Sequence, residues 1–283
     1  MSLRDARMPG NDARKEALST RDAPIAIERV ATTASTNDDL LERVRAAAAA
    51  GETSFAPCLL VADAQTAGRG RNGRQWHSRP GHSLTFSLAW QPRRADLAGL
   101  SLAVGAAIAD ALDPPRGDAP RIGLKWPNDL WLVDRDAAPQ HVGRKLAGIL
   151  IETAPLGAGR VAVIGVGVNV AAVAVANAAS GLASLDEIDR AATPRSTLAR
   201  IAPALGAALE RFDAAGFAVF AERFAMRDVL RGRNVIAMSG EVGGVASGIG
   251  PDGALLVDTG ERIVAVTSGE WRLRIATAVE RSC

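Results

Sequence analysis

Apolar side chains recur with a period of two along several short segments of the chain, and this pattern predicts strands. Residues 84–90 (LTFSLAW) are the clearest example, because large apolar side chains there alternate with smaller ones. Segments with apolar residues three and four positions apart predict helices instead. By these criteria we expect strands at 25–32, 57–63, 84–90, 122–126, 130–133, 146–152 and 161–168, and helices at 97–112, 197–212 and 217–226.

A further helix is expected after the first strand, because both of its ends carry signals. Ser35 is a favourable N-cap, and Asp38 and Asp39 place acidic groups in the first turn. Gly51 is the residue type that most often follows the end of a helix. Since most predicted strands are joined by turns rather than by helices, we expect an α+β fold with a mixed, largely antiparallel sheet and flanking helices.

The pattern changes near residue 229, where helical spacing gives way to short strands and glycine turns. Strands are expected at 235–238, 241–249, 254–258 and 262–267. We therefore predict a small β-barrel over residues 229–283, after a larger domain over residues 25–228. Residues 1–24 are polar, with charges of both signs, and we expect them to form a disordered tail.

Composition limits the class of protein. A chain of 283 residues with 48% hydrophobic residues is long enough for one large domain and one small one. No apolar run approaches the roughly 20 residues needed to span a bilayer, and the amino-terminal segment lacks the apolar centre of a secretory signal. We expect a cytoplasmic protein without membrane association, in which Cys58 and Cys283 are reduced thiols. The net charge of +2 argues against strong binding of a polyanion.

Residues 68–74 (GRGRNGR) combine arginines with glycines directly after a predicted strand. Glycine lets the backbone approach a ligand closely, and arginine binds carboxylate and phosphate oxygens. The segment also fits the G-x-G-x-x-G pattern of dinucleotide-binding loops, but the apolar helix that this pattern requires does not follow it. We favour an anion-binding loop, with an exposed basic turn and an RNA-binding segment as the alternatives.

Lysine is scarce in this chain, which makes its positions informative. Only three of the 33 basic residues are lysines, and Lys15 lies in the expected tail. Lys125 is followed by Trp-Pro-Asn-Asp, in which the proline ends the strand so that the next two polar residues project from a turn. Lys145 lies at the start of an apolar strand. A plain strand–turn–strand connection and a solvated strand end are the alternatives, but lysine in an arginine-rich chain favours functional ammonium groups.

Gly165 and Gly167 interrupt the apolar strand at 161–168. Glycine inside a strand indicates that another group approaches the backbone closely, either a ligand or a packed helix. The sequence contains no G-x-S-x-G, C-x-x-C or H-E-x-x-H pattern, and its three histidines lie in expected loops. A catalytic metal held by protein ligands alone is therefore not expected.

Taken in order, these segments resemble the biotin protein ligase family. The resemblance rests on Ser35-Thr36-Asn37, on Gln65-Thr66-Ala67-Gly68 and the arginines after it, on residues 125–129, 145–148 and 165–169, and on the closing segment 268–275. Each motif alone is weak, but the first five, in order and at sensible spacing, are specific. The resemblance implies a catalytic domain like that of class II aminoacyl-tRNA synthetases, followed by an SH3-like barrel.

The resemblance also implies a two-step reaction. Biotin and ATP form biotinyl-5′-adenylate and pyrophosphate, and a lysine of a biotin carboxyl carrier protein then takes the biotinyl group. The alternatives are a lipoate ligase, with the same chemistry on another acid, and a nucleic-acid-binding protein without catalysis. The polar set formed by residues 35–37 and Gln65 suits a ureido group better than a dithiolane.

Residue roles follow from the resemblance by position. The implied catalytic residues are Lys145, Arg71 and Arg69. The implied biotin-binding residues are Ser35, Thr36, Asn37, Gln65, Gly68, Arg69, Gly70, Arg71, Lys145, Gly148, Gly165 and Gly167. The implied nucleotide-binding residues are Arg71, Arg74, Trp76, Lys125, Asn128, Asp129 and Asn169. Mg²⁺ would come with ATP, and Asp129 is its candidate contact on the protein.

Two departures from the family's pattern shape further expectations. Residues 134–144 are longer than the usual turn before Lys145, and we expect an exposed loop without a catalytic role. Only about 24 residues precede the first strand, too few for the winged helix-turn-helix of the family's repressors. We expect a monofunctional ligase that does not bind DNA and that is a monomer or a weak homodimer.

Overall fold

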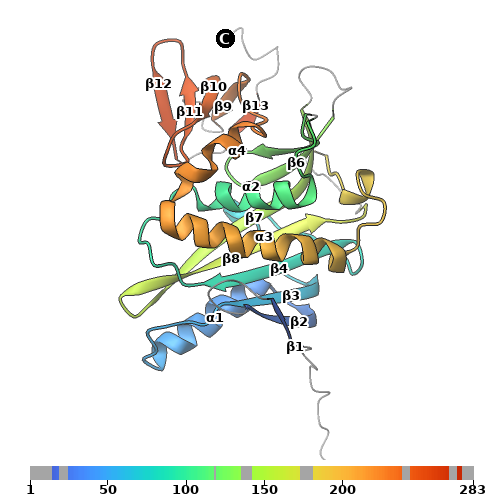
Figure 1. The fold of residues 1–283 in the computed structure, drawn as a ribbon, viewed down its shortest axis with the longest axis vertical. Helices are drawn as coiled ribbons and strands as arrows, with labels where there is room; N and C mark the ends of the chain where they lie inside the picture. The colour runs from blue at the N-terminus through green and yellow to red at the C-terminus, as the bar shows by residue number, and fades with distance from the viewer. Residues whose placement is uncertain are drawn as a thin grey trace, which may run out of the picture.

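The structure is a computed structural model. It describes residues 15–18, 25–117, 119–134, 142–172, 181–237, 243–267 and 273–275. Within these residues the chain forms one large sheet with helices on both faces, and a smaller sheet near the carboxyl end (Figure 1). The α+β class expected from the sequence is confirmed.

The large sheet is mixed and largely antiparallel. Among the described residues its strand order is β1-β2-β3-β4-β8-β7-β6-β5. Among the strand pairings that the structure describes in this sheet, only that of β2 with β3 is parallel, because α1 (Thr36–Ala49) connects these strands as a crossover. The strands are β1 (Lys15–Leu18), β2 (Ile25–Thr33), β3 (Cys58–Gln65), β4 (Ser83–Trp90), β5 (Ile122–Lys125), β6 (Asp129–Val133), β7 (Gly143–Leu156) and β8 (Gly159–Asn169).

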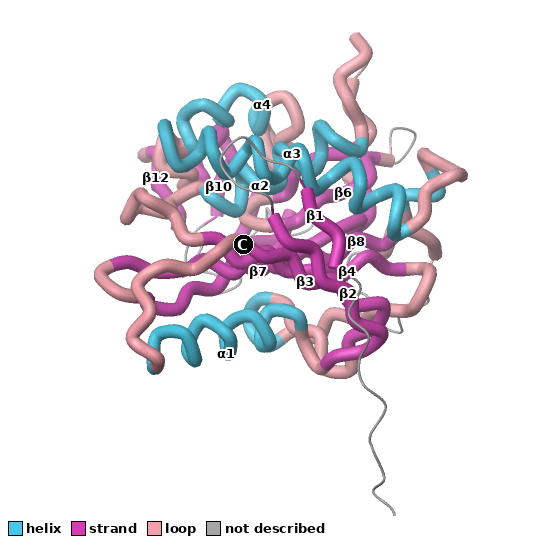
Figure 2. Tube along the Cα trace, turned by 60° about the horizontal axis from the view of Figure 1, so that its bottom comes forward, coloured by secondary structure: helices cyan, strands magenta, loops and turns pink. Residues whose placement is uncertain are grey.

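Helices cover both faces of this sheet. Helix α1 lies on one face, and α2 (Leu100–Leu112) and α3 (Pro194–Ala215) lie on the other (Figure 2). Strand β8 shows the consequence for sequence: Ala162 and Ile164 belong to the core under α2 and α3, whereas Val161 and Val163 belong to the core under α1. A strand buried on both faces reads as a continuous apolar run.

Helix α1 begins where its sequence signals predict, whereas α2 begins at Leu100 rather than at residue 97 and α3 begins at Pro194 rather than at residue 197. The Ser35 hydroxyl accepts a hydrogen bond from the backbone N–H of Asp38 and caps α1. Residues 217–226, expected as one helix, form a 3₁₀ turn at Phe217–Phe220 followed by the short helix α4 (Ala221–Ala225). Further 3₁₀ turns lie at Arg71–Gly73 and Leu185–Glu187.

The smaller sheet occupies the region where a β-barrel was predicted. Its order among the described residues is β12-β11-β10-β9-β13, and every pairing is antiparallel. The strands are β9 (Asn234–Ala237), β10 (Gly243–Ile249), β11 (Leu255–Asp258), β12 (Ile263–Val266) and β13 (Leu273–Ile275). Its β10–β11 turn contacts the larger part of the chain, because the indole N–H of Trp126 donates a hydrogen bond to the Gly253 carbonyl at 3.0 Å.

Three expectations concern residues that are wholly or partly outside the described ranges. A disordered tail was expected over residues 1–24, but residues 15–18 form β1, which pairs antiparallel with β2. The expectation is wrong for these four residues, since the outer edge of β2 offers unpaired backbone groups to which a strand can add. The rest of that segment, residues 135–141 of the predicted loop, and Cys283 lie outside the described residues. No helix in the described ranges is long and apolar enough to cross a membrane.

Candidate active site

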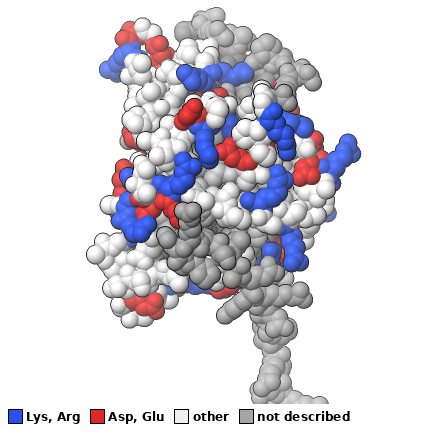
Figure 3. Space-filling model, viewed as in Figure 1, with Lys and Arg blue, Asp and Glu red and all other residues white. Residues whose placement is uncertain are grey.

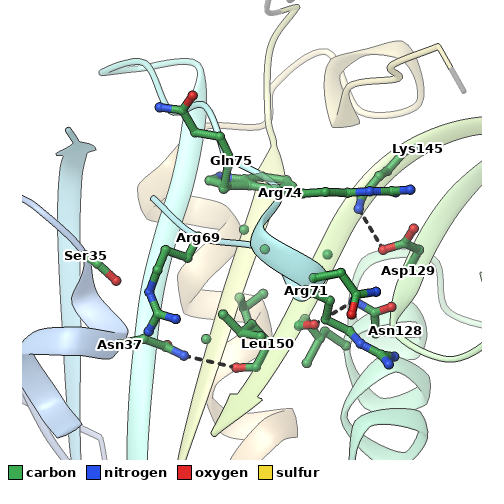
Figure 4. Close-up of a pocket in the computed structure, with 18 of the residues that line it drawn as sticks. Ser35, Asn37, Arg69, Arg71, Arg74, Gln75, Asn128, Asp129, Lys145 and Leu150 are labelled. Carbon is green, nitrogen blue, oxygen red and sulfur yellow. Dashed lines mark hydrogen bonds and ion pairs between the residues drawn. The ribbon is translucent and has the colours of Figure 1, made fainter. Parts of the chain in front are cut away.

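A cavity of about 190 Å³ opens where the start of α1, the loop after β3 and the strands β7 and β8 meet. Figure 4 shows Asn37 and Arg69 on one side of it and Asn128, Asp129 and Lys145 on the other. The chain brings these groups together from distant positions because β3, β4, β8, β7 and β6 are neighbours in the sheet. Its lining consists of Ser35, Thr36, Asn37, Gln65, Arg69, Gly70, Arg71, Asn72, Arg74, Gln75, Trp76, Phe86, residues 125–129, Lys145, Gly148, Ile149, Leu150, Gly165, Val166 and Gly167.

The glycine–arginine loop folds back on itself as a small hairpin. Residues 68–70 run beside residues 74–76, with a bridge between Arg69 and Gln75 and a hydrogen bond from the Trp76 N–H to the Gly68 carbonyl at 2.8 Å. The turn has positive φ at Asn72 (56°) and Gly73 (72°), which asparagine and glycine tolerate best. The arginines of this hairpin thereby lie over the cavity.

Buried polar groups form the inner wall on the α1 side. The Gln65 side-chain oxygen accepts hydrogen bonds from the backbone N–H of Thr36 at 2.8 Å and from its hydroxyl at 3.1 Å. The Thr36 and Ser87 hydroxyls lie 2.7 Å apart, and Ser87 donates to Asn37 Oδ1 at 2.6 Å. Because Gln65 uses its oxygen within the protein, its amide N–H groups remain as donors for a ligand.

Arg69 forms ion pairs with two carboxylates. Its guanidinium donates to Asp38 and to both oxygens of Glu152, at 3.0 and 2.8 Å. The hydrogen bonds to Asp38, followed by those to Glu152, raise the pKa of Arg69. The arginine is therefore held between α1 and β7.

Cations gather at the opposite side of the cavity. Lys145 Nζ lies 2.7 Å from Asp129 Oδ1, and the Asn128 amide donates to the Ile149 carbonyl at 2.8 Å. Lys125 Nζ lies 4.9 Å from the centre of the Trp131 ring. Burial lowers the pKa of Lys125, and the nearby cations Lys145 and Arg74 lower it further, against the opposing effect of Asp129. Burial also lowers the pKa of Arg71.

Side chains from other parts of the protein approach the backbone closely at the two strand glycines, Gly165 and Gly167. A Cβ on Gly167 would lie 2.2 Å from the Trp76 ring, and a Cβ on Gly165 would lie 2.3 Å from Asn37 Oδ1. The group that approaches Gly167 is therefore the Trp76 ring of the hairpin, and the group that approaches Gly165 is a side chain in the first turn of helix α1. The Trp76 indole N–H is buried and has no hydrogen-bond partner within the described part of the chain, so it suits an acceptor atom of a ligand.

Most residues expected in the site do line this one cavity; Gly68 and Asn169 do not. A Cβ on Gly68 would lie 2.5 Å from the Trp76 carbonyl oxygen, so this glycine permits the hairpin. The Asn169 amide is buried and donates to the carbonyls of Lys145 (3.3 Å) and Ala183 (3.1 Å), so it fixes the backbone at Lys145. Their expected contacts with ligands stay predictions.

Sequence reasoning missed the acidic partners of Arg69. Glu152 was within a recognised segment, and it lies two residues beyond Leu150 on the same strand, β7. Because side chains two positions apart on a strand point to the same face, the spacing of Glu152 from Gly148 and Leu150 indicated that its carboxylate lies on the side of the cavity. Asp38 was interpreted only as a helix-start residue, a role that does not exclude pairing with Arg69.

Known proteins resemble both parts of the chain. Residues 33–169 match the Biotin/lipoate A/B protein ligase family, and residues 232–271 match the Biotin protein ligase C terminal domain. The bifunctional ligase/repressor BirA of Escherichia coli is 36% identical over 86% of this chain and 72% of its own length. The biotin–[acetyl-CoA-carboxylase] ligase of Mycobacterium tuberculosis is 33% identical over 86% of this chain and 87% of its own length. 

A solved structure agrees with these matches. The biotin protein ligase of Aquifex aeolicus in complex with biotin and ATP has a TM-score of 0.70 and 27% identity, covering 88% of this chain and 99% of that one. Sequence, fold and cavity thus lead to one assignment. The chain belongs to the biotin protein ligase family.

Proposed function

We propose that this chain is an ATP-dependent ligase that attaches biotin to a lysine of a biotin carboxyl carrier protein. The biotin carboxylate attacks the α-phosphorus of ATP, so that an acyl phosphate bond forms and pyrophosphate leaves. The lysine amine then attacks the acyl carbon, so that an amide forms and AMP leaves. The observation that carries the proposal is one cavity with a buried polar wall at one side and a cluster of cations at the other.

The polar wall suits the ureido ring of biotin. Ser35, Thr36, Asn37 and Gln65 supply donors and acceptors within a small space. A ureido group has both N–H donors and a carbonyl acceptor, and burying them requires such partners. A dithiolane offers no comparable hydrogen bonds, which disfavours lipoate as the substrate.

The cations suit the carboxylate and the phosphates. Lys145 and Arg71 neutralise the charge that develops as the carboxylate meets the α-phosphate, and Arg74 and Lys125 bind the remaining phosphates. Trp76 and Asn128 contact the adenosine part. The described residues contain no cluster of three acidic, histidine or cysteine ligands. Asp129 with the phosphate oxygens is the donor set that Mg²⁺ accepts, and the ion would neutralise phosphate charge.

We further propose that residues 25–228 carry this chemistry and that residues 229–283 form a module attached to it. A monomeric or weakly dimeric state, the absence of DNA binding and a cytoplasmic location stay predictions. Figure 3 shows acidic and basic side chains interspersed on the face it presents, which gives no sign of an extended polyanion-binding surface there.

Exchange of pyrophosphate into ATP tests the proposed function. We expect exchange that depends on biotin and that lipoate does not support. Exchange driven by lipoate alone would identify the substrate as a different acid. Absence of exchange with both acids would overturn the proposal of an adenylating enzyme.

A further inference from the structure

Glu152 has two partners that belong to different parts of the site. Its carboxylate accepts from Arg69, on the glycine–arginine loop, at 2.8 and 3.0 Å. It also accepts from the Asn37 amide, in the buried wall, at 2.8 Å. The Glu152 side chain is 28% exposed and Asn37 is 4% exposed, so the carboxylate connects the surface with the interior.

The bond to Asn37 fixes which way its amide faces. Asn37 Nδ2 lies between two acceptors, Glu152 and the Leu150 carbonyl (3.3 Å), so Oδ1 must face the Ser87 hydroxyl. Because Ser87 donates its proton to that oxygen, the Ser87 oxygen is an acceptor for the Thr36 hydroxyl 2.7 Å away, whose one proton is shared between Ser87 and Gln65. The orientation set at Glu152 thus passes along the wall to the groups expected to bind the ureido ring.

The charge on Arg69 is already balanced within the protein. Asp38 and Glu152 together carry two negative charges against its single positive one. Lys145, by contrast, forms an ion pair with one carboxylate, that of Asp129. Arg69 is therefore better suited to hold the loop in place than to stabilise a ligand's negative charge.

We propose that Glu152 is a positioning residue of the biotin site: it holds Arg69, together with Asp38, and through Asn37 it orients the buried hydrogen bonds. This inference deepens the proposed function and rests on it. The loop over the cavity and the wall inside it are then connected through the Glu152 carboxylate. Losing that carboxylate weakens biotin binding although the residue does not line the cavity.

Glu152→Gln tests the proposal with little change in shape. The amide carries no charge, and its N–H groups must replace one of the two oxygens. If the amide oxygen takes the place of Oε2, which accepts from both Asn37 and Arg69, the N–H groups take the place of Oε1 and face the Arg69 guanidinium. We expect the KM for biotin in pyrophosphate exchange to rise about tenfold, the size of one lost hydrogen bond between charged groups, while the KM for ATP stays within about twofold. The double variant Glu152→Gln/Arg69→Gln is expected to be less impaired than the product of the single effects.

Glu28→Gln is a matched control. Like Glu152, Glu28 pairs with an arginine: its carboxylate lies 2.9 Å from Arg43, a residue of α1. Neither Glu28 nor Arg43 lines the cavity. We expect it to leave both KM values unchanged. Equal KM values for biotin in the two variants would overturn the inference, and so would a parallel rise in both KM values of Glu152→Gln.

A variant that fails to fold does not end the test. Arg69→Gln alters a side chain that is 41% exposed, and the inference requires the same selective rise in the KM for biotin. An unchanged KM in that variant would equally overturn it. Failure of the proposed function looks different, since the unmodified protein would then show no exchange driven by biotin.

Discussion

Replacement of Lys145 by alanine is the sharpest test of where the chemistry occurs. The ammonium group lies 2.7 Å from Asp129 and 5.9 Å from the centre of the Trp76 ring, and the side chain is 26% exposed. Lysine at this point can reach a carboxylate and a phosphate placed in the cavity. The change to alanine removes that charge and leaves the strand backbone in place.

The size of the effect differs between folding and catalysis. At 2.7 Å and an effective dielectric constant of about 20, the attraction to Asp129 is about 6 kcal/mol before desolvation. Solvent screening and side-chain entropy reduce the net contribution of such partly exposed pairs to roughly 1 kcal/mol or less. Removal of one fixed group that stabilises charge in the transition state costs about 3–4 kcal/mol, or roughly 100- to 1,000-fold in kcat. We therefore expect a large loss of rate with a small loss of stability.

Pyrophosphate exchange driven by biotin measures the rate, and urea unfolding measures the stability. Arg160→Ala is the control, because it removes one positive charge from an exposed strand end and should leave exchange unchanged. A kcat within about tenfold of the unmodified protein would refute the reasoning. An equal loss in the control would attribute the effect to net charge instead.

Three further changes test other parts of the site. Arg71→Gly, unlike Arg71→Lys, should let the adenylate escape, so that a bystander protein mixed with the carrier becomes biotinylated; labelling confined to the carrier would contradict this. Trp126→Phe removes the donor to the Gly253 carbonyl and should lower the free energy of unfolding by about 1 kcal/mol or more; an unchanged midpoint of urea unfolding would contradict this. Because burial lowers the pKa of Lys125, its charge is lost as pH rises through a value below the ordinary value of about 10.4, and the KM for ATP should rise there; Lys125→Arg should abolish that rise. The same shift predicts stability that increases with pH between the folded and unfolded pKa values, because the unfolded state binds more protons.

Local pattern predicted the strands well because each face of the large sheet is covered. Strand β8 read as a continuous apolar run for that reason, and β4 alternated bulky with small side chains. Lys145 and Asp129 were each predicted close to the start of a strand, and they lie near the starts of β7 and β6. Both were recognised as separate motifs, and pairing of β6 with β7 brings them together.

Features that depend on tertiary contacts escaped prediction. The strand at residues 15–18 owes its existence to the free edge of β2 rather than to its own polar sequence. The ion pairs of Arg69 require residues 31 and 83 positions away, so no local pattern signals them. The 3₁₀ turn at Phe217–Phe220 begins at Gly216, whose φ of 70° ends α3 and redirects the chain.

The contact at Gly253 bears on how the chain can be divided. A Cβ on Gly253 would lie 2.6 Å from the Gly99 Cα, and both residues have positive φ, so two backbones meet where no side chain fits. Trp126, which follows the last residue of β5, is 2% exposed and is hydrogen-bonded at the same point. A fragment ending at residue 228 would expose this indole beside the proposed phosphate-binding lysine. The carboxyl-terminal module thus covers Trp126, the residue next to that lysine in sequence, and a fragment without the module is expected to unfold more readily than the whole chain.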